Sequence, residues 1–312
     1  MTLGYSPNAT AQSMRLGATK TVGIVISHLN APFLADWVSA AQDVFHSAGY
    51  ATLLGTYTSS REREIDVIQA LLRRRVDALL LSSSSELDKD LLALLKETQV
   101  PIVLIDRELP EWADSVTVNH RGATRRSIDF LIKLGHRRIG AILGGEAIYP
   151  SRERLIGYRT AHQEAGVPID PQLVGSDFFL PDYGFSQTLE LFRKPSPPTA
   201  IISGGLPLPG VLRALRELRL RIPDDVSLVA TSESDLTELM TPPLSCESWN
   251  APEVGSIAAQ IALERMRNGS TEARAKRVTI PSDFVVRDSC GVPARAVEQA
   301  KPARKRANAG KA

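Results

Sequence analysis

The sequence has little of what a disulfide-stapled or membrane-spanning protein requires. Cys246 and Cys290 are its only cysteines, and two thiols so far apart in a chain without an export signal are expected to stay reduced. The N-terminus lacks a basic segment followed by an apolar stretch, which argues against a secretory signal. No uninterrupted apolar run reaches the roughly 20 residues that cross a bilayer. These absences indicate a cytoplasmic protein that does not enter the membrane.

Signatures of catalysis and of metal binding are also missing. No serine lies in a nucleophile-elbow motif, and no His, Cys and carboxylate residues have the spacing of metal ligands. Gly144-Gly145 and Gly204-Gly205 follow predicted strands but lack the remainder of a nucleotide-binding fingerprint. Nothing supplies a nucleophile, a base and an orienting group together. We therefore expect no catalytic residues, no metal and no cofactor, and a protein that is not an enzyme.

What the sequence does contain is enough apolar residues for a large core. Its 312 residues are 43% hydrophobic, and a chain of this length usually divides into two domains or lobes. The net charge of +2 is unevenly spread, because residues 295–312 carry a net +5 and the remainder −3. A body with that balance is a poor nucleic-acid binder by bulk charge. We expect the basic tail to be disordered and solubilising, with non-specific DNA contact as the alternative.

Short apolar runs alternate with stretches of helical periodicity along most of the chain. Parallel sheets covered by helices on both faces produce this alternation, and the number of units exceeds one comfortable sheet. The predicted strands are residues 21–26, 50–54, 77–81, 101–105, 138–143, 199–203 and 226–230. The predicted helices are residues 34–48, 65–72, 87–95, 123–134, 152–165, 184–193 and 208–219.

Small polar residues follow several of these strands, and ligands of such folds bind at the carboxyl ends of the strands. The segments are Ser27-His28, Thr56-Tyr57, 82–85, Asp106-Arg107, Asn119-His120, 203–205 and Thr231-Ser232. Each alone is explained by loop solubility, but together they suggest a polar cleft for a small molecule. Arg154, near the start of a predicted helix, either offers its planar fork of donors to a hydroxylated or anionic ligand or forms a surface salt bridge.

An ordered series of short segments belongs to one recognisable type of sequence. It starts with residues 3–14 and the strand 21–26, and it ends with Val285-Val-Arg-Asp-Ser289. Between them lie Asp77-Ala-Leu-Leu-Leu81, Val103-Leu-Ile-Asp-Arg107, Leu134-Gly-His-Arg-Arg-Ile-Gly140, Glu153-Arg-Leu-Ile-Gly-Tyr158, Pro223-Asp-Asp-Val-Ser-Leu-Val229 and Thr241-Pro-Pro-Leu244. In this order the segments resemble those of the LacI family of bacterial transcriptional regulators, over nearly all of residues 3–291.

The resemblance implies an α/β fold of the type I periplasmic-binding-protein-like class. Such a fold has two Rossmann-like lobes with parallel sheets, joined by three crossovers, which by resemblance lie near Gly135, Trp249 and Pro281. The implied division is a hinge segment at 1–18, an N-terminal lobe at 19–135 plus 249–280, a C-terminal lobe at 136–248 plus 281–291, and a basic disordered tail at 292–312.

The resemblance also implies ligand contacts in the cleft between the lobes. Phe33 and Leu34 match positions where the family packs aromatic side chains against its ligand, and Ser84 and Arg154 match polar contacts. Carboxylates that are frequent in the family are replaced here by Gly204-Gly205, Ser232 and Asn119, which argues against a simple pyranose held by paired aspartates. Tyr183 and Trp249 are expected to add stacking surface. The expected ligand-binding residues are thus Phe33, Leu34, Ser84, Asn119, Arg154, Tyr183, Gly205, Ser232 and Trp249.

Residues 9–15 match the hinge helix of the family, and Asn8 is suited to cap it. So short a helix is marginal alone in water, so we expect it to form only when DNA and a second copy support it. Met14 is expected to enter the minor groove in place of the family's usual leucine, with Ala11 and Arg15 as further DNA contacts. A disordered lead-in is the alternative. The family's helix-turn-helix head is expected to be encoded upstream of Met1 or to have been lost.

The favoured interpretation is an effector-responsive transcriptional regulator, most simply a repressor. It would act on operator DNA as a homodimer or tetramer, with a sugar or sugar derivative as effector in the interlobe cleft. A solute-binding protein of a transport system is the alternative, which the hinge-like residues 7–14 and the missing signal disfavour. An enzyme on a similar scaffold is disfavoured, because the sequence shows no set of catalytic residues. The nucleotide sequence upstream of Met1 discriminates, because an in-frame helix-turn-helix favours the regulator.

Overall fold

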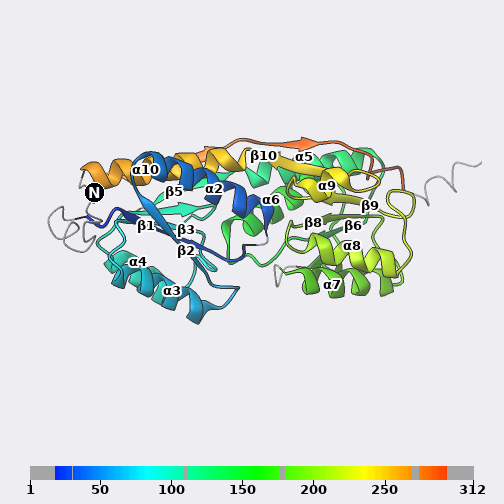
Figure 1. Ribbon diagram of the computed structural model, residues 1–312. Helices are drawn as coiled ribbons and strands as arrows, with labels where there is room; N and C mark the ends of the chain where they lie inside the picture. Colours follow the sequence, from blue (N-terminus) through cyan, green and yellow to red (C-terminus); the bar gives the residue numbers. More distant parts are fainter. Residues whose placement is uncertain (1–17, 30, 109–111, 176–179, 269–273, 294–312) are drawn as a thin grey trace, which may run out of the picture.

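A computed structural model describes residues 18–29, 31–108, 112–175, 180–268 and 274–293. The predicted hinge contacts Ala11, Met14 and Arg15 lie outside the described residues, and so does the tail from residue 294 onward. The described chain forms an elongated body with two α/β lobes side by side (Figure 1).

The first lobe contains a six-stranded sheet in the order β11-β5-β4-β3-β1-β2. Every pair of neighbouring strands in it is parallel. The central strands are short and apolar, because helices cover both of their faces. The strands are β1 (Thr21–Ile26), β2 (Ala51–Thr56), β3 (Ala78–Leu81), β4 (Ile102–Ile105), β5 (Asp114–Val118) and β11 (Arg277–Ile280).

The second lobe repeats this plan with the order β12-β10-β9-β8-β6-β7. Only β12 departs from the parallel arrangement, since it runs antiparallel to β10 at one edge of the sheet. In each sheet the parallel strands have their carboxyl ends at the same edge. Loops that follow these strands in both sheets lie at the space between the lobes. The strands are β6 (Ile139–Ile142), β7 (Val174–Gly175), β8 (Ala200–Ser203), β9 (Ser227–Ala230), β10 (Ser245–Trp249) and β12 (Ser282–Val285).

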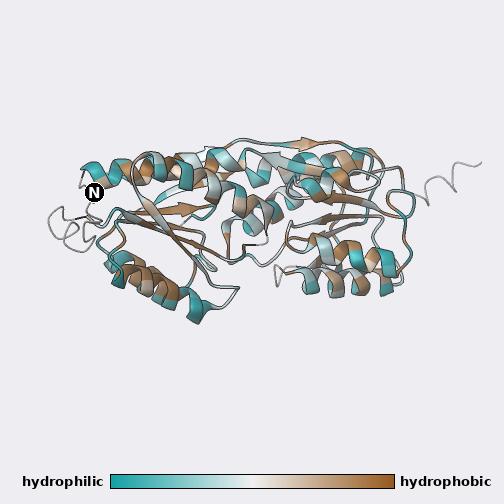
Figure 2. Cartoon of the chain, viewed as in Figure 1, coloured by the Kyte–Doolittle hydropathy of each residue, from teal (hydrophilic) through white to brown (hydrophobic). Residues whose placement is uncertain are grey.

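Helices cover both faces of each sheet, and their apolar sides face the strands (Figure 2). In the first lobe, α2 (Pro32–Ser47) and α10 (Ala251–Asn268) pack on one face, and α3 (Arg61–Arg73) and α4 (Lys89–Glu97) on the other. In the second lobe, α5 (His120–Lys133) and α6 (Tyr149–Glu164) oppose α7 (Pro181–Arg193) and α8 (Leu208–Glu217). A short helix, α9 (Asp235–Leu239), and a 3-10 turn at Pro171–Leu173 complete the second lobe.

Side-chain caps fix where several of these helices begin. Ser60 accepts a hydrogen bond from the backbone N–H of Arg63 at the start of α3, and Asp88 accepts two at the start of α4. Asn119 caps α5 by accepting from Gly122 N at 3.0 Å. Each of these caps lies in the loop that follows a parallel strand, so the loops at the carboxyl ends of the strands also start the helices.

The chain passes between the lobes three times, at Asn119, between Trp249 and Ala251, and at Pro281. The first crossing precedes α5, whose Ile128 and Leu131 lie in the core of the second lobe. A boundary at Gly135, as the resemblance implied, would have left α5 with the first lobe, so that expectation is corrected. Helical periodicity marks the apolar face of α5 but not the sheet against which that face packs.

Among the described residues, no helix combines the length and the apolar character needed to cross a membrane.

Candidate functional site

A cavity of about 250 Å³ lies between the two lobes. Loops that follow β1, β2, β3 and β4 line it from one side, and loops that follow β8 and β9 line it from the other. The start of α2 and the start of α6 contribute further lining residues. This is the position that doubly wound sheets reserve for ligands, at the carboxyl ends of their strands.

Seven of the nine ligand contacts expected from the sequence line this cavity. They come from both lobes and from the second crossing. These residues are Phe33, Leu34, Ser84, Arg154, Gly205, Ser232 and Trp249.

The two remaining expected contacts, Asn119 and Tyr183, do not line the cavity. The side chain of Asn119 caps α5, and its backbone N–H donates to Ile280 O at 3.0 Å, so it serves the first crossing. Tyr183 lies on α7, packs against the core under that helix, and has its hydroxyl beside Gly175. Asn119 differs from the expectation because a residue next to a strand end can turn toward the neighbouring helix instead of the cleft. Tyr183 differs because α7 directs it toward the core of the second lobe.

One wall of the cavity is aromatic. Phe33 and Trp249 meet edge to face with their ring centroids 6.4 Å apart, and the guanidinium of Arg154 lies 5.9 Å from the Trp249 ring. Gly205 passes close to the same wall, since a Cβ atom there would lie 2.4 Å from Ser232 Oγ. Glycine at this position therefore lets the loop after β8 approach Ser232 and Phe33 closely.

A buried polar network forms the floor beneath that wall. Arg154 Nη2 donates to Nδ1 of His120 at 3.0 Å and to Thr231 O at 3.2 Å. Because a guanidinium can only donate, Nδ1 of His120 is unprotonated, and Nε2 carries the proton that it donates to Asp106 Oδ2 at 2.8 Å. Burial, reinforced by the charge of Arg154, lowers the pKa of His120, which keeps the ring neutral.

This network connects the two lobes at the first crossing. Asp106 follows β4 of the first lobe, whereas Arg154 lies on α6 of the second lobe, and His120 at the start of α5 bonds to both. Burial alone would raise the pKa of Asp106, but the hydrogen bond from His120 and the positive charges of Arg107 and Arg154 lower it overall. Asp106 therefore stays ionised and holds the ring in one tautomer.

A second buried acid lies on the far side of Arg154. Glu247 Oε2 lies 3.5 Å from Arg154 Nε as an ion pair, and Glu247 Oε1 accepts from Thr124 Oγ1 at 2.6 Å. Burial raises the pKa of Glu247 to about 7, against the lowering effect of Arg154. Arg154 is only 4% exposed, so it is held from behind by the protein while one side faces the cavity.

Several of these residues were not identified individually from the sequence. Asp106, Arg107 and His120 were included only as polar strand ends, and Trp37 only as an apolar position of a helix. Glu247 had no signal at all, because it lies in a strand that the hydrophobic pattern did not predict. Polar residues at the ends of predicted strands indicated the cavity from the sequence. Glu247, the buried partner of Arg154, could be identified only from the tertiary structure.

Within the described part of the chain, no group of three or more His, Cys, Asp or Glu residues could hold a metal ion. The lining offers stacking surface, guanidinium groups and hydroxyl groups, which bind a small polar molecule without any further group.

Two α/β lobes with a lined cavity between them and three crossings define a ligand-binding protein of the periplasmic-binding-protein-like class. The profile of the periplasmic binding protein-like domain matches residues 128–290. The HTH-type transcriptional repressor PurR of Actinobacillus pleuropneumoniae serotype 3 (strain JL03) is 30% identical over 290 residues, which is 92% of this chain and 86% of the relative.

Solved structures agree with this relationship. The transcriptional regulator CelR, in complex with cellobiose, is 29% identical with a TM-score of 0.78, and the match covers 92% of each chain. A LacI family transcriptional regulator from Mycobacterium smegmatis is 25% identical with a TM-score of 0.78, over 87% of this chain and 99% of that one. The chain belongs to the LacI family of transcriptional regulators, as the sequence predicted.

Proposed function

We propose that this protein is a transcriptional repressor whose DNA affinity responds to a small molecule bound between its lobes. The observation that carries the proposal is the interlobe cavity, whose wall is built by both lobes and whose buried network joins them. A ligand that touches both lobes binds one relative arrangement more tightly than another and shifts the population toward it. Such a shift is the output that an effector-responsive regulator requires.

The effector is proposed to be a sugar or a sugar derivative. CelR has been solved in complex with cellobiose, and this chain matches CelR over nearly its whole length. The aromatic pair Phe33 and Trp249 offers a stacking surface of the kind that apolar faces of sugar rings need, and Arg154 and Ser232 offer polar contacts. We assign ligand contact to the seven expected residues that line the cavity.

DNA contact is proposed to come from the segment before the first lobe. Ala11, Met14 and Arg15 are the proposed hinge contacts, with operator specificity supplied by a helix-turn-helix head of the kind named in the PurR relative. The protein is proposed to act in the cytoplasm, as a homodimer, because a pair of hinge helices reads the two halves of a palindromic site. No catalytic step is proposed for it.

The ligand-binding part of the proposal is tested by thermal shift with a panel of sugars, sugar acids and purines. A compound that binds the folded state raises the Tm, and calorimetry then gives its affinity. The Arg154→Met variant should lose most of that affinity. The matched control is Arg159→Met, on the same helix, whose guanidinium is exposed and pairs with Glu146. Unchanged affinity in the Arg154→Met variant would overturn the assignment of the cavity.

The regulatory part needs a separate readout. Full-length protein is mixed with fragmented genomic DNA and collected on a filter, with and without the compound found by thermal shift. A repressor that responds to its effector retains a different amount of specific DNA in the two cases. Equal retention, with the cavity saturated, would contradict the coupling between ligand and DNA.

A further inference from the structure

The charges that line the interlobe cavity are unbalanced. Its lining includes two guanidinium groups, those of Arg107 and Arg154, but only one carboxylate, that of Asp106. Arg154 has its counter-ion behind the wall in Glu247. Arg107 has no such partner, since no acidic oxygen of the described residues lies within ion-pair distance of it.

Arg107 is nevertheless buried and firmly held. It is 6% exposed, its Nε donates to Ser83 O at 2.6 Å, and its Nη1 donates to Asp106 O at 2.7 Å. Both acceptors are backbone carbonyls, which orient the guanidinium without neutralising its charge. A buried cation without a counter-ion is costly, and proteins usually pair it or neutralise it.

The nearby acids are already bonded to the protein. The Asp106 carboxylate accepts from His120 Nε2 and from Val118 N at 3.2 Å. The Glu64 carboxylate, behind the cavity wall, accepts from Ser84 N at 3.1 Å and from the Ser84 hydroxyl. The charge of Arg107 acts to lower the pKa of both acids, so both lie near it, but neither forms an ion pair with it. A directly paired counter-ion would therefore have to come from a bound molecule.

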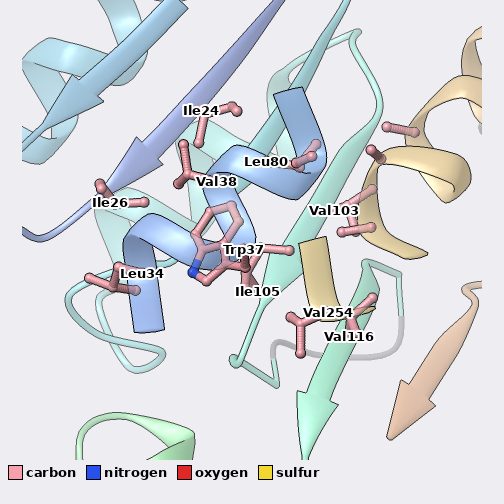
Figure 3. Packing of buried hydrophobic residues seen from close by; sticks show 14 of the residues in the cluster. Ile24, Ile26, Leu34, Trp37, Val38, Leu80, Val103, Ile105, Val116 and Val254 are labelled. Carbon is pink, nitrogen blue, oxygen red and sulfur yellow. The ribbon is translucent and has the colours of Figure 1, made fainter. Parts of the chain in front are cut away.

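An unsatisfied donor belongs to another residue that lines the same cavity. The indole Nε1 of Trp37 is buried and has no acceptor, and Trp37, Leu34 and Ile105 all line the cavity. Figure 3 shows the indole packed beside Leu34 and Ile105, with its nitrogen at the edge of the ring nearer Leu34. Together with Arg107 it gives this part of the cavity two donor groups that a bound anion can use.

We propose that Arg107 forms an anion subsite that selects a small hydroxylated effector carrying a carboxylate or a phosphate group. This rests on the proposed function of the cavity, and it narrows the effector class from sugars in general to their acidic derivatives. The anionic group supplies the missing counter-ion, and charge-assisted hydrogen bonds from a guanidinium to such a group are strong and directional. Arg107 is thereby a specificity-determining residue.

The subsite is tested first with simple anions. The Tm of the full chain is measured in sodium phosphate, sodium acetate and sodium chloride at equal ionic strength and pH. Phosphate or acetate should raise the Tm of the wild-type chain by about 2 °C or more relative to chloride. Arg107→Gln should abolish this difference, and Arg107→Lys, which retains the charge, should keep part of it.

Comparing salts within each variant makes the result independent of any loss of stability that the substitution itself causes. The matched control is Arg152→Gln, which removes a guanidinium on α6 that pairs with Glu86. That variant should keep the anion-dependent rise. No rise in the wild-type chain, or an equal rise in Arg107→Gln, would overturn the proposal.

Matched pairs of compounds then identify the anion. D-Gluconate is compared with D-glucose, and D-ribose 5-phosphate with D-ribose, by calorimetry. The acidic member of a pair should bind about tenfold or more tightly than the neutral one, and Arg107→Gln should remove that preference. Tight binding of a neutral sugar with no effect of Arg107→Gln would sink the subsite and leave the proposed function intact. The proposed function fails separately if two results are found together. Anions would still bind the Arg154→Met variant, and none of them would change the amount of DNA that the full-length protein retains.

Discussion

At the scale of single residues, the site depends on charged and polar groups that are removed from water and satisfied by one another. Arg154, His120 and Asp106 form a chain of hydrogen bonds, and the pKa of His120 is lowered so that the ring stays neutral. Buried networks of this kind are stable only when complete. The stability of the fold and the ligand site are therefore linked through the same atoms.

Arg154→Met should destabilise the chain by about 1–3 kcal/mol, because Glu247 is left in the interior without its cation. The cost stays below that of most broken buried pairs, since Glu247 already has a pKa of about 7 and can take up a proton. Glu247→Gln alone should cost about 1 kcal/mol or less. The double variant should be more stable than the sum of the two losses predicts. Urea unfolding at pH 7 measures all three; strictly additive losses would argue against the coupling.

The contributions of His136 and Glu247 to the free energy of unfolding change in opposite directions with pH. Its ring accepts from Thr199 Oγ1 at 2.8 Å and donates to Gly291 O at 2.9 Å, and burial lowers its pKa to about 4. Because the unfolded chain binds this proton more tightly, its contribution is complete above pH 6.5 and is lost as the pH falls toward 4. Glu247, with a raised pKa, loses stability as the pH rises from 4.5 toward 7.

The two effects partly cancel in the wild-type chain, so a variant is needed to separate them. The difference in unfolding free energy between the wild type and His136→Gln should shrink by roughly 1–3 kcal/mol between pH 7.5 and pH 4.5. His46→Gln, at an exposed position of α2, is the control and should show no such trend. A constant difference for His136→Gln across this range would contradict the assignment.

At the scale of elements, helix packing fixes the shape of the cavity. Gly255 of α10 faces α2 so closely that a Cβ atom would lie 1.9 Å from the backbone oxygen of Trp37. The approach of these two helices places the Trp37 indole against the cavity. The spacing between α2 and α10 is therefore part of the site, since residues of both helices line the cavity.

Gly255→Ala should force α10 away from α2 and destabilise the chain by about 2 kcal/mol or more, despite the better helix propensity of alanine. It should also weaken binding of any cavity ligand, because Trp37 moves. Gly166→Ala is the control: Gly166 has φ +65° and no neighbour within 4 Å, so it should cost about 1 kcal/mol of backbone strain and leave ligand affinity unchanged. Thermal unfolding and calorimetry measure the two effects. Equal effects of both substitutions would refute the packing argument.

The elements that could be predicted from the sequence are those whose apolar pattern is continuous. The predicted strands at 21–26 and 101–105 coincide with β1 and β4 to within a residue, whose side chains are buried on both faces. β5 and β10 were not predicted, because Asp114 and Glu247 interrupt their apolar pattern. Tertiary partners satisfy both acids: Arg265 lies 2.8 Å from Asp114, and Arg154 pairs with Glu247.

The prediction of the site was also incomplete, because the tertiary partners of polar side chains are not visible in the sequence. Strand ends are visible in the sequence, and seven of the expected contacts lie at the cavity. Whether a strand-end side chain turns into the cavity or caps a helix depends on local hydrogen bonds, which separated Asn119 from Ser84. Helix α10 was not among the predicted helices, and its buried face is rich in small residues such as Ala258 and Ala262 that give a weak apolar signal.

At the scale of the whole molecule, two lobes that pack separately are joined by three short crossings and by polar contacts such as the Arg154–His120–Asp106 network and the Arg152–Glu86 ion pair. Such an arrangement allows the lobes to change their relative position while each core stays intact, as hinge motions require. The effector is proposed to act by stabilising one arrangement, and the N-terminal segment, which precedes the first lobe in sequence, is proposed to report it to DNA.

Homodimer formation, expected from the resemblance to the LacI family, makes a prediction at this scale. Sedimentation equilibrium at micromolar concentration should give twice the 33.9 kDa of one chain, or four times that mass if dimers pair. A symmetric pair is the usual solution for a regulator of palindromic sites. A purely monomeric chain at these concentrations would remove the dimer from the proposal without affecting the cavity.

The most direct measurement is a crystal structure of the chain with the compound that raises its Tm most. We expect density for that compound in the space between the lobes, in contact with Arg154 and stacked near Trp249, with its acidic group at Arg107. Density at any other surface, together with an empty interlobe space, would contradict the claim that this protein senses a small molecule between its lobes.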